Sequence, residues 1–121
     1  MADHAVLVHS AFDASHQIED DPLCGRDHGH TFHVTACVEG ILERDESSIW
    51  RVFGTEDLQQ RLDSVTRELD LRDLNAMMPG STPIPETIAA WILERITDAD
   101  YVEVEMGWRR LTGRASRNKK R

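Results

Sequence analysis

Residues 24–40 read CGRDHGHTFHVTACVEG, and this stretch decides the fold. From position 31 to position 39, apolar and polar side chains alternate with a period of two, which is typical of a half-buried β-strand. The apolar members of this alternation are Phe32, Val34, Ala36 and Val38. Gly40 ends the stretch, and His28 and His30 come directly before the alternating part. The sequence therefore predicts a strand that carries a histidine cluster at its start.

The segments outside this stretch alternate or repeat in ways that predict the remaining elements. Strands are predicted at 5–12 (AVLVHSAF) and 101–108 (YVEVEMGW), with a further short strand considered at 49–53. Apolar residues recur at helical spacing over 55–69, and again over 86–96 after a proline suited to a first helical turn. The order is strands, two helices and a final strand. It predicts an α+β domain with an antiparallel sheet and both helices on one face.

The composition narrows the class of protein. A chain of 121 residues with 40% hydrophobic side chains suits one globular domain and argues against wholesale disorder. The apolar runs are too short to cross a membrane, and no basic region precedes the first of them, so we expect no membrane span and no signal peptide. A disulfide between Cys24 and Cys37 is not needed at this size. We therefore predict a reducing, cytoplasmic location.

Charge is unevenly distributed along the chain. The net charge is −8, yet residues 109–121 hold 7 of the 14 basic residues and none of the acidic ones. We predict that residues 109–121 form a basic, flexible tail behind a domain at 1–108. Nucleic-acid binding through this tail is an alternative, but it is not expected, because the acidic remainder of the chain repels phosphates.

The histidines are placed so that three of them can meet. His28 and His30 are two residues apart, so on a strand they point the same way, and Gly29 leaves room between them. His16 shares a face with Phe12 if the first strand continues that far. Antiparallel pairing would then bring the three rings together. Three imidazoles with one open position are typical of a catalytic zinc site, whereas the alternative is a chance His-Gly-His in a loop.

Several motifs in a fixed order carry a resemblance to a known family. They are FDASH (12–16), CGRDHGHTFHVTACVEG (24–40), LDLRDLN (69–75), PIPETIAAWI (83–92) and VEVEMG (102–107). Together they resemble the 6-pyruvoyltetrahydropterin synthase and 6-carboxytetrahydropterin synthase family over residues 5–108. The resemblance implies the tunnelling fold (T-fold), in which a four-stranded antiparallel sheet carries two helices on one face. It also implies a homo-oligomer, a trimer or a hexamer, with active sites between subunits.

The resemblance assigns a role to each candidate site residue. His16, His28 and His30 would bind Zn²⁺, and Cys24 would be the base that moves a side-chain proton of a dihydropterin. Asp70 would belong to the proton relay, and Glu105 would anchor the pterin through paired hydrogen bonds. From the residues alone, Asp70 is equally a turn residue near a helix end, and Glu105 is an ordinary solvent-facing strand residue.

One position departs from the family pattern in a way that bears on the reaction. Leu71 stands where the relay histidine is usual, and leucine cannot transfer a proton, although one general acid or base contributes roughly 10²–10⁴-fold in rate. Asp27 or Asp73 is a hypothetical replacement. We therefore predict a zinc-dependent lyase acting on a dihydropterin, such as 7,8-dihydroneopterin triphosphate or a related metabolite, with an altered step such as retro-aldol cleavage or cyclisation. The alternative is a non-catalytic, zinc-containing member that binds a ligand.

Overall fold

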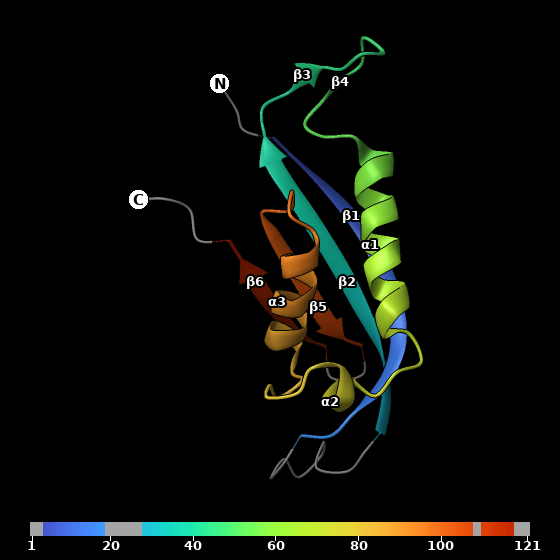
Figure 1. Ribbon diagram of the computed structural model, residues 1–121. Coiled ribbons are helices and arrows are strands. Elements are labelled where there is room, and N and C mark those ends of the chain that lie inside the picture. Colours follow the sequence, from blue (N-terminus) through green and yellow to red (C-terminus); the bar gives the residue numbers. More distant parts are fainter. Residues whose placement is uncertain (1–3, 19–27, 108–109, 118–121) are drawn as a thin grey trace.

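The structure is a computed structural model that describes residues 4–18, 28–107 and 110–117. Its main sheet is four-stranded and antiparallel, in the order β1-β2-β5-β6. These strands are β1 (His4–His16), β2 (His28–Gly40), β5 (Tyr101–Met106) and β6 (Leu111–Ser116). The helices α1 (Thr55–Leu69) and α3 (Pro85–Arg95) pack on one face of this sheet (Figure 1). The predicted α+β T-fold is confirmed.

The first two strands are longer than their apolar alternation predicts. Both β1 and β2 span 13 residues, and they pair without interruption from His4 opposite Gly40 to His16 opposite His28. The apolar alternation does not reach the end of β1 or the start of β2, because those positions carry Ser15 and His16 in β1 and His28, Gly29 and His30 in β2. This continuation places the histidine cluster inside a regular ladder rather than in a loop.

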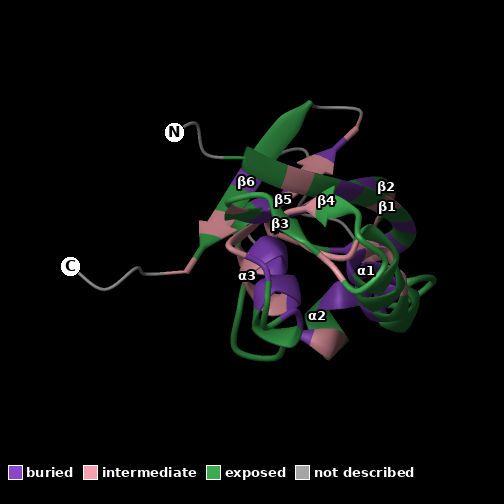
Figure 2. Ribbon diagram, turned by 90° about the horizontal axis from the view of Figure 1, so that it is seen from above, coloured by how far each residue is buried: buried purple, intermediate pink, exposed green. Residues whose placement is uncertain are grey.

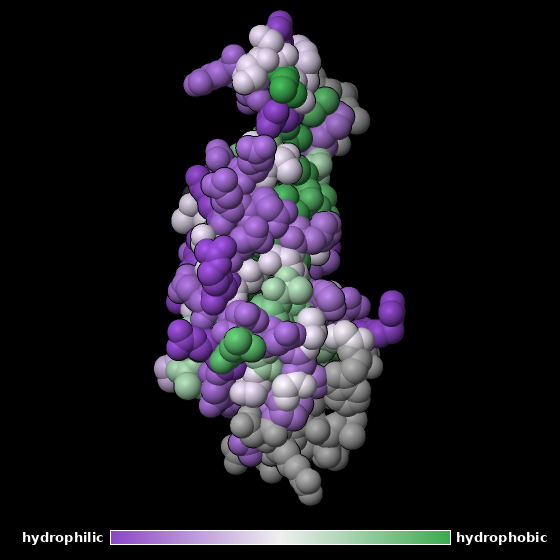
Figure 3. All heavy atoms as spheres, turned by 90° about the vertical axis from the view of Figure 1, so that its right-hand side faces the viewer, coloured by the Kyte–Doolittle hydropathy of each residue, from purple (hydrophilic) through white to green (hydrophobic). Residues whose placement is uncertain are grey.

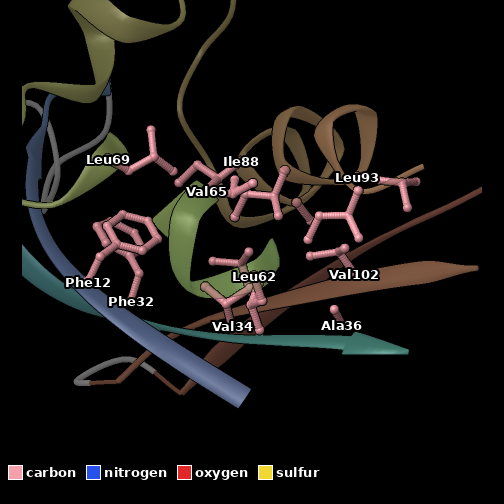
Figure 4. Close-up of a cluster of buried hydrophobic side chains, with 14 of the residues drawn as sticks. Phe12, Phe32, Val34, Ala36, Leu62, Val65, Leu69, Ile88, Leu93 and Val102 are labelled. Atoms are coloured by element: carbon pink, nitrogen blue, oxygen red, sulfur yellow. The ribbon is translucent and has the colours of Figure 1, made fainter. Parts of the chain in front are cut away.

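The core lies between the inner face of the sheet and the two long helices. The rings of Phe12 and Phe32 stack at a centroid distance of 5.1 Å, and helix side chains cover them (Figure 4). Buried residues concentrate in this layer when the molecule is seen from above (Figure 2). Fully burying one such side chain contributes roughly 1.5–3 kcal/mol before the cost of ordering is subtracted. The core residues that α1 and α3 contribute are Leu58, Leu62, Val65, Leu69, Ile88, Ala89, Ile92 and Leu93.

The connections hold two small elements. A two-stranded ribbon of β3 (Glu43–Arg44) and β4 (Trp50–Arg51) precedes α1, which agrees with a short strand near residue 50. The short helix α2 (Leu74–Met77) lies between α1 and α3. The side chain of Asp73 caps α2 by accepting a hydrogen bond from the Asn75 backbone N–H at 3.1 Å.

The surface is mainly polar on the face shown in Figure 3, with apolar side chains gathering toward the β3–β4 end. Exposed apolar residues there include Ile41, Ile49 and Trp50. None of the helices within the described ranges is long and apolar enough to cross a membrane.

The prediction of a flexible tail from residue 109 is wrong for residues 111–116, which form β6. Arg114 binds Glu103 on the neighbouring strand, with its Nε 2.8 Å from Oε2. Arg117 donates hydrogen bonds of 2.7 Å to the carbonyl oxygens of Leu93, Ile96 and Ala99, which lie at and beyond the end of α3. Arg114 and Arg117, whose charge suggests a solvated tail, thus attach the edge strand β6 to the rest of the domain. Residues 118–121 lie outside the described part of the chain.

Replacing Gly113 with alanine is expected to destabilise the fold by about 3 kcal/mol, because overpacking forces backbone shifts. A Cβ at this position would lie 2.7 Å from both the Cα of Glu86 and the carbonyl carbon of Pro85, at the start of α3. Urea denaturation of both proteins measures the difference in the free energy of unfolding. The matched control is Gly107→Ala, whose Cβ would meet nothing closer than 3.7 Å. Equal losses in the two variants would contradict the close packing of β6 on α3.

Candidate metal centre

The three histidines of the predicted zinc site come together at one end of the β1–β2 ladder. His16 pairs with His28, and His30 pairs with Ala14, so all three side chains project to the same face of the sheet. One ring nitrogen from each histidine lies within 4.8 Å of the others. The ring centroids are 4.3–4.9 Å apart. His9 and His33 are each an odd number of residues away from the cluster histidine on their own strand, and they are exposed on the opposite face.

The floor of the cluster is apolar and closed to water. His16 is fully buried, whereas His28 and His30 are partly exposed. The ring of Phe32 lies edge-on beneath the cluster, with its centroid 5.5 Å from that of His16 and 5.7 Å from that of His30. Phe32 itself is fully buried against Phe12. Among the described residues, His16 thus forms the buried end of the cluster, and His28 and His30 form its partly exposed end.

A backbone contact determines which nitrogen of His16 faces the cluster. The Nδ1 atom of His16 lies 2.7 Å from the carbonyl oxygen of Pro83. A carbonyl oxygen only accepts, so Nδ1 carries the proton in this contact, and when the ring is neutral the lone pair is on Nε2. Metal-binding histidines are held in this way, with one nitrogen donating to a carbonyl and the other binding the ion. The donor set fits zinc, which imidazole nitrogens bind well.

The sequence does not reveal this contact with Pro83. Its carbonyl belongs to the backbone, so no residue type marks it, and the two residues are 67 positions apart. Only the packing of the loop before α3 against the end of β1 brings them together.

The predicted catalytic residues are placed differently from the histidines. Cys24 lies outside the described residues, as does Asp27. The carboxylate of Asp70 accepts a hydrogen bond of 2.9 Å from the backbone N–H of Asp13, at the edge of β1. Asp70 is not part of the histidine cluster, and its observed contact is that of a turn residue after α1. Asp73 is likewise engaged, as the cap of α2. The catalytic role of Asp70 stays a prediction.

Leu71, where the resemblance leads one to expect a relay histidine, borders a pocket beside the cluster. Its side chain is 82% exposed and its backbone is left-handed, with φ at 61°. Its N–H donates to the carbonyl oxygen of Asp13 at 2.6 Å, which fixes it along the edge of β1. The pocket has a volume of about 470 Å³. Leu71 and Arg72 line it together with Asp13, Ser15, His30 and Thr31.

Glu105 lies on the face of the sheet opposite the histidines. In β5 the side chains of Val104 and Met106 are buried in the core, so Glu105 between them points the other way, beside His33 of β2. One copy of the chain thus does not bring Glu105 and the histidine cluster to one site. Its predicted role in anchoring a pterin stays a prediction.

Cys37 has the properties of a core residue rather than a nucleophile. It is fully buried in β2, and this burial is the main factor that raises the pKa of its thiol. A hydrogen bond with Tyr101 acts in the opposite direction, and the carboxylates of Glu39 and Asp100 add to the increase. The thiol therefore stays protonated at neutral pH and has little reactivity.

Comparison with known proteins places this geometry in context. Residues 5–108 match the family model described as 6-pyruvoyl tetrahydropterin synthase. The dihydroneopterin monophosphate aldolase of Pyrococcus furiosus is 35% identical over 91 residues, which cover 75% of this chain and 73% of that protein. Among solved structures, the 6-pyruvoyl tetrahydropterin synthase of Caenorhabditis elegans has a TM-score of 0.80 at 16% identity, covering 98% of both chains. The Plasmodium vivax enzyme has a TM-score of 0.73 at 14% identity, covering 98% of this chain and all of that one.

Proposed function

This chain belongs to the 6-pyruvoyl tetrahydropterin synthase family, and from that premise we propose that it is a zinc-dependent carbon–carbon lyase. Its substrate would be a dihydropterin with a phosphorylated side chain, which it would cleave by a retro-aldol reaction. The observation that carries the proposal is the cluster of His16, His28 and His30, with the Nε2 of His16 aimed inward by Pro83. The name of the 35%-identical relative, an aldolase, supports this reaction over elimination.

The three histidines would hold the zinc ion, which when bound supplies Lewis-acid polarisation of side-chain oxygens. The protein contributes the arrangement around it. Pro83 fixes the ring of His16, and Phe32 keeps water from the floor of the cluster. The pocket beside His30 leaves space for a ligand on the open side.

The reaction balances with a single base. Cys24, as thiolate, would take the proton of the hydroxyl on the second side-chain carbon. The bond between the first and second side-chain carbons then breaks, and its electron pair moves into the C=N bond of the dihydropterin ring. An aldehyde forms on the two-carbon fragment, which keeps the phosphate. The carbon left on the ring regains a proton from the thiol, which gives a hydroxymethyl dihydropterin.

Leu71 favours this reaction over elimination of triphosphate. The retro-aldol step removes one proton and returns one, so a single thiol can serve both transfers. The family's elimination uses a relay in which a histidine works with the aspartate and the cysteine. At Leu71 no proton can be passed on. The chain thus keeps the residues needed for the simpler proton transfer and lacks one needed for the longer relay.

The position of Glu105 supports a site shared between copies. Glu105 lies on the face opposite the histidines, so we propose a homo-oligomer, a trimer or hexamer, in which it anchors the pterin bound beside the histidines of another copy. Its carboxylate can accept two parallel hydrogen bonds from an amino-pyrimidinone edge. We expect the assembly in the cytoplasm, where reducing conditions keep the Cys24 thiol available.

Metal content and turnover, measured on one purified sample, test the proposal. Elemental analysis gives the zinc, and mass spectrometry identifies products from 7,8-dihydroneopterin monophosphate and triphosphate. The expected result is about one zinc per chain and a hydroxymethyl dihydropterin as product. If zinc is bound but neither substrate is converted, the assignment as a lyase is wrong, and a non-catalytic ligand-binding protein is favoured. Absence of zinc would overturn the metal site.

A further inference from the structure

The outer edge of β1 is covered near its end by the segment that follows α1. Leu71 donates its N–H to the carbonyl oxygen of Asp13, and two residues further Ser15 donates its N–H to the carbonyl oxygen of Arg72 at 3.0 Å. Ser15 and Asp73 form a parallel β-bridge. This segment therefore acts as a short fifth strand beside the end of β1 that carries His16.

At Gln17, the residue after His16, the hydrogen bonds to the edge of the strand come from the side chain of Asn75 rather than from backbone groups. The Oδ1 atom of Asn75 accepts a hydrogen bond of 2.7 Å from the Gln17 N–H. The Nδ2 atom of Asn75 donates a hydrogen bond of 2.9 Å to the Gln17 carbonyl oxygen. A carboxamide has the same donor and acceptor as a peptide group, so Asn75 imitates one more residue of the neighbouring strand. Both backbone groups of Gln17 are fixed by this one side chain.

Asn75 is itself held firmly. Its backbone N–H donates to the carboxylate of Asp73, and the neighbouring Leu74 is fully buried in the core. The amide therefore extends from a fixed turn of helix rather than from a mobile loop. Gln17 and Asn75 also line a second pocket, of about 520 Å³, with Gly80, Ser81 and Thr82. Without the amide, the end of β1 would face this space.

We propose that Asn75 is a positioning residue for the histidine cluster. Pro83 fixes the ring of His16, while Asn75 fixes the backbone directly after it. Both constraints are needed to aim Nε2 of His16 at His28 and His30, because a ring held only at Nδ1 moves with its own Cα. The metal part of this inference rests on the proposed function, since it takes the cluster as a zinc site. The alignment of the His16 ring does not depend on that.

A purely structural role predicts something different, and the chain offers a matched control. The side-chain amide of Gln59 donates a hydrogen bond of 2.8 Å to the carbonyl oxygen of His9, on the same strand. This contact lies seven residues before His16, roughly 23 Å along an extended strand. If Asn75 acts only through the overall stability of the fold, then Asn75→Ala and Gln59→Ala should affect the cluster alike.

The experiment uses the full chain with Asn75→Ala, Asn75→Asp and Gln59→Ala. In metal-free protein, NMR follows the Nδ1 proton of His16, which its bond to Pro83 protects from exchange with water. We expect Asn75→Ala to speed this exchange markedly and Gln59→Ala to leave it unchanged. Asn75→Asp keeps the acceptor for the Gln17 N–H but loses the donor, so it should fall between the two. It serves as the folded test if Asn75→Ala does not fold.

Chelator competition then measures zinc affinity in the same proteins. Asn75→Ala should weaken zinc binding by roughly 10–100-fold, as the loss of groups that orient ligands does. Gln59→Ala should not change it. The proposal is overturned if the exchange of the His16 proton is the same in the variants and the parent protein. If the parent protein binds no zinc, the proposed function is wrong. The proposal for Asn75 is then still tested, because the NMR measurement is made on metal-free protein.

Discussion

The variant His28→Ala is expected to lose zinc and turnover together while its sheet stays folded. His28 supplies one of the three clustered ring nitrogens, and its side chain is only partly buried, so alanine leaves no large cavity. Losing groups that merely orient ligands costs 10–100-fold in metal affinity, so loss of a ligand should cost roughly 100-fold or more. Turnover should fall to the background rate because the polarising ion is gone.

The matched control is His33→Ala on the same strand. His33 is exposed on the opposite face of β2, so its removal should leave the zinc content unchanged. Zinc after dialysis, circular dichroism and kcat are measured on the three proteins. If His28→Ala kept a full equivalent of zinc, the ion would be bound elsewhere, and the assignment of the centre to these histidines would be wrong.

The variant Cys24→Ser is expected to lower kcat by roughly 10²–10⁴-fold, the usual contribution of a general base. A serine hydroxyl is far less acidic than a thiol, so it cannot hold the negative charge that proton abstraction requires. Zinc content should not change, because the three histidines remain. The measurement is steady-state turnover with zinc analysis on the same sample.

Cys37→Ser is the control for this substitution, because it changes the other cysteine in the same way. Burial raises the pKa of the Cys37 thiol and removes it from reaction, so its replacement should leave kcat near the parent value. Some loss of stability is expected from placing a hydroxyl at a buried position. Should Cys24→Ser turn over at the parent rate, another group would have to be the base, and Asp27 would become the first candidate.

Strand parity predicts much of the candidate site from the sequence. The positions of His28 and His30 two residues apart, and of His16 in step with Phe12, suffice to place the three rings on one face, where the structure has them. Parity also separates the exposed His9 and His33 from the cluster. These inferences succeed because side-chain direction on a strand depends only on position, whatever the residue type.

Other features depend on contacts that residue type does not indicate. The seven basic residues of 109–121 suggest a solvated tail, yet Arg114 and Arg117 attach β6 to Glu103 and to the end of α3. The same kind of contact makes Asn75 an extension of the strand ladder. Sequence patterns report burial well, whereas a polar side chain that binds a distant backbone looks like any exposed residue. The separation of Glu105 from the histidines likewise follows only once the faces of the sheet are known.

The pairing of His16 with His28 also bears on how the sheet chooses its alignment. A shift of β1 against β2 by one residue would turn every inward side chain outward, but a shift by two would keep each side chain on its own face. Burial alone therefore discriminates weakly between the native alignment and its two-residue neighbours. Only the native alignment sets His16 directly across from His28. An ion that binds this arrangement stabilises it by RT ln(1 + [Zn]/Kd). Zinc present during folding would therefore favour the native register of β1 and β2 over registers shifted by two residues.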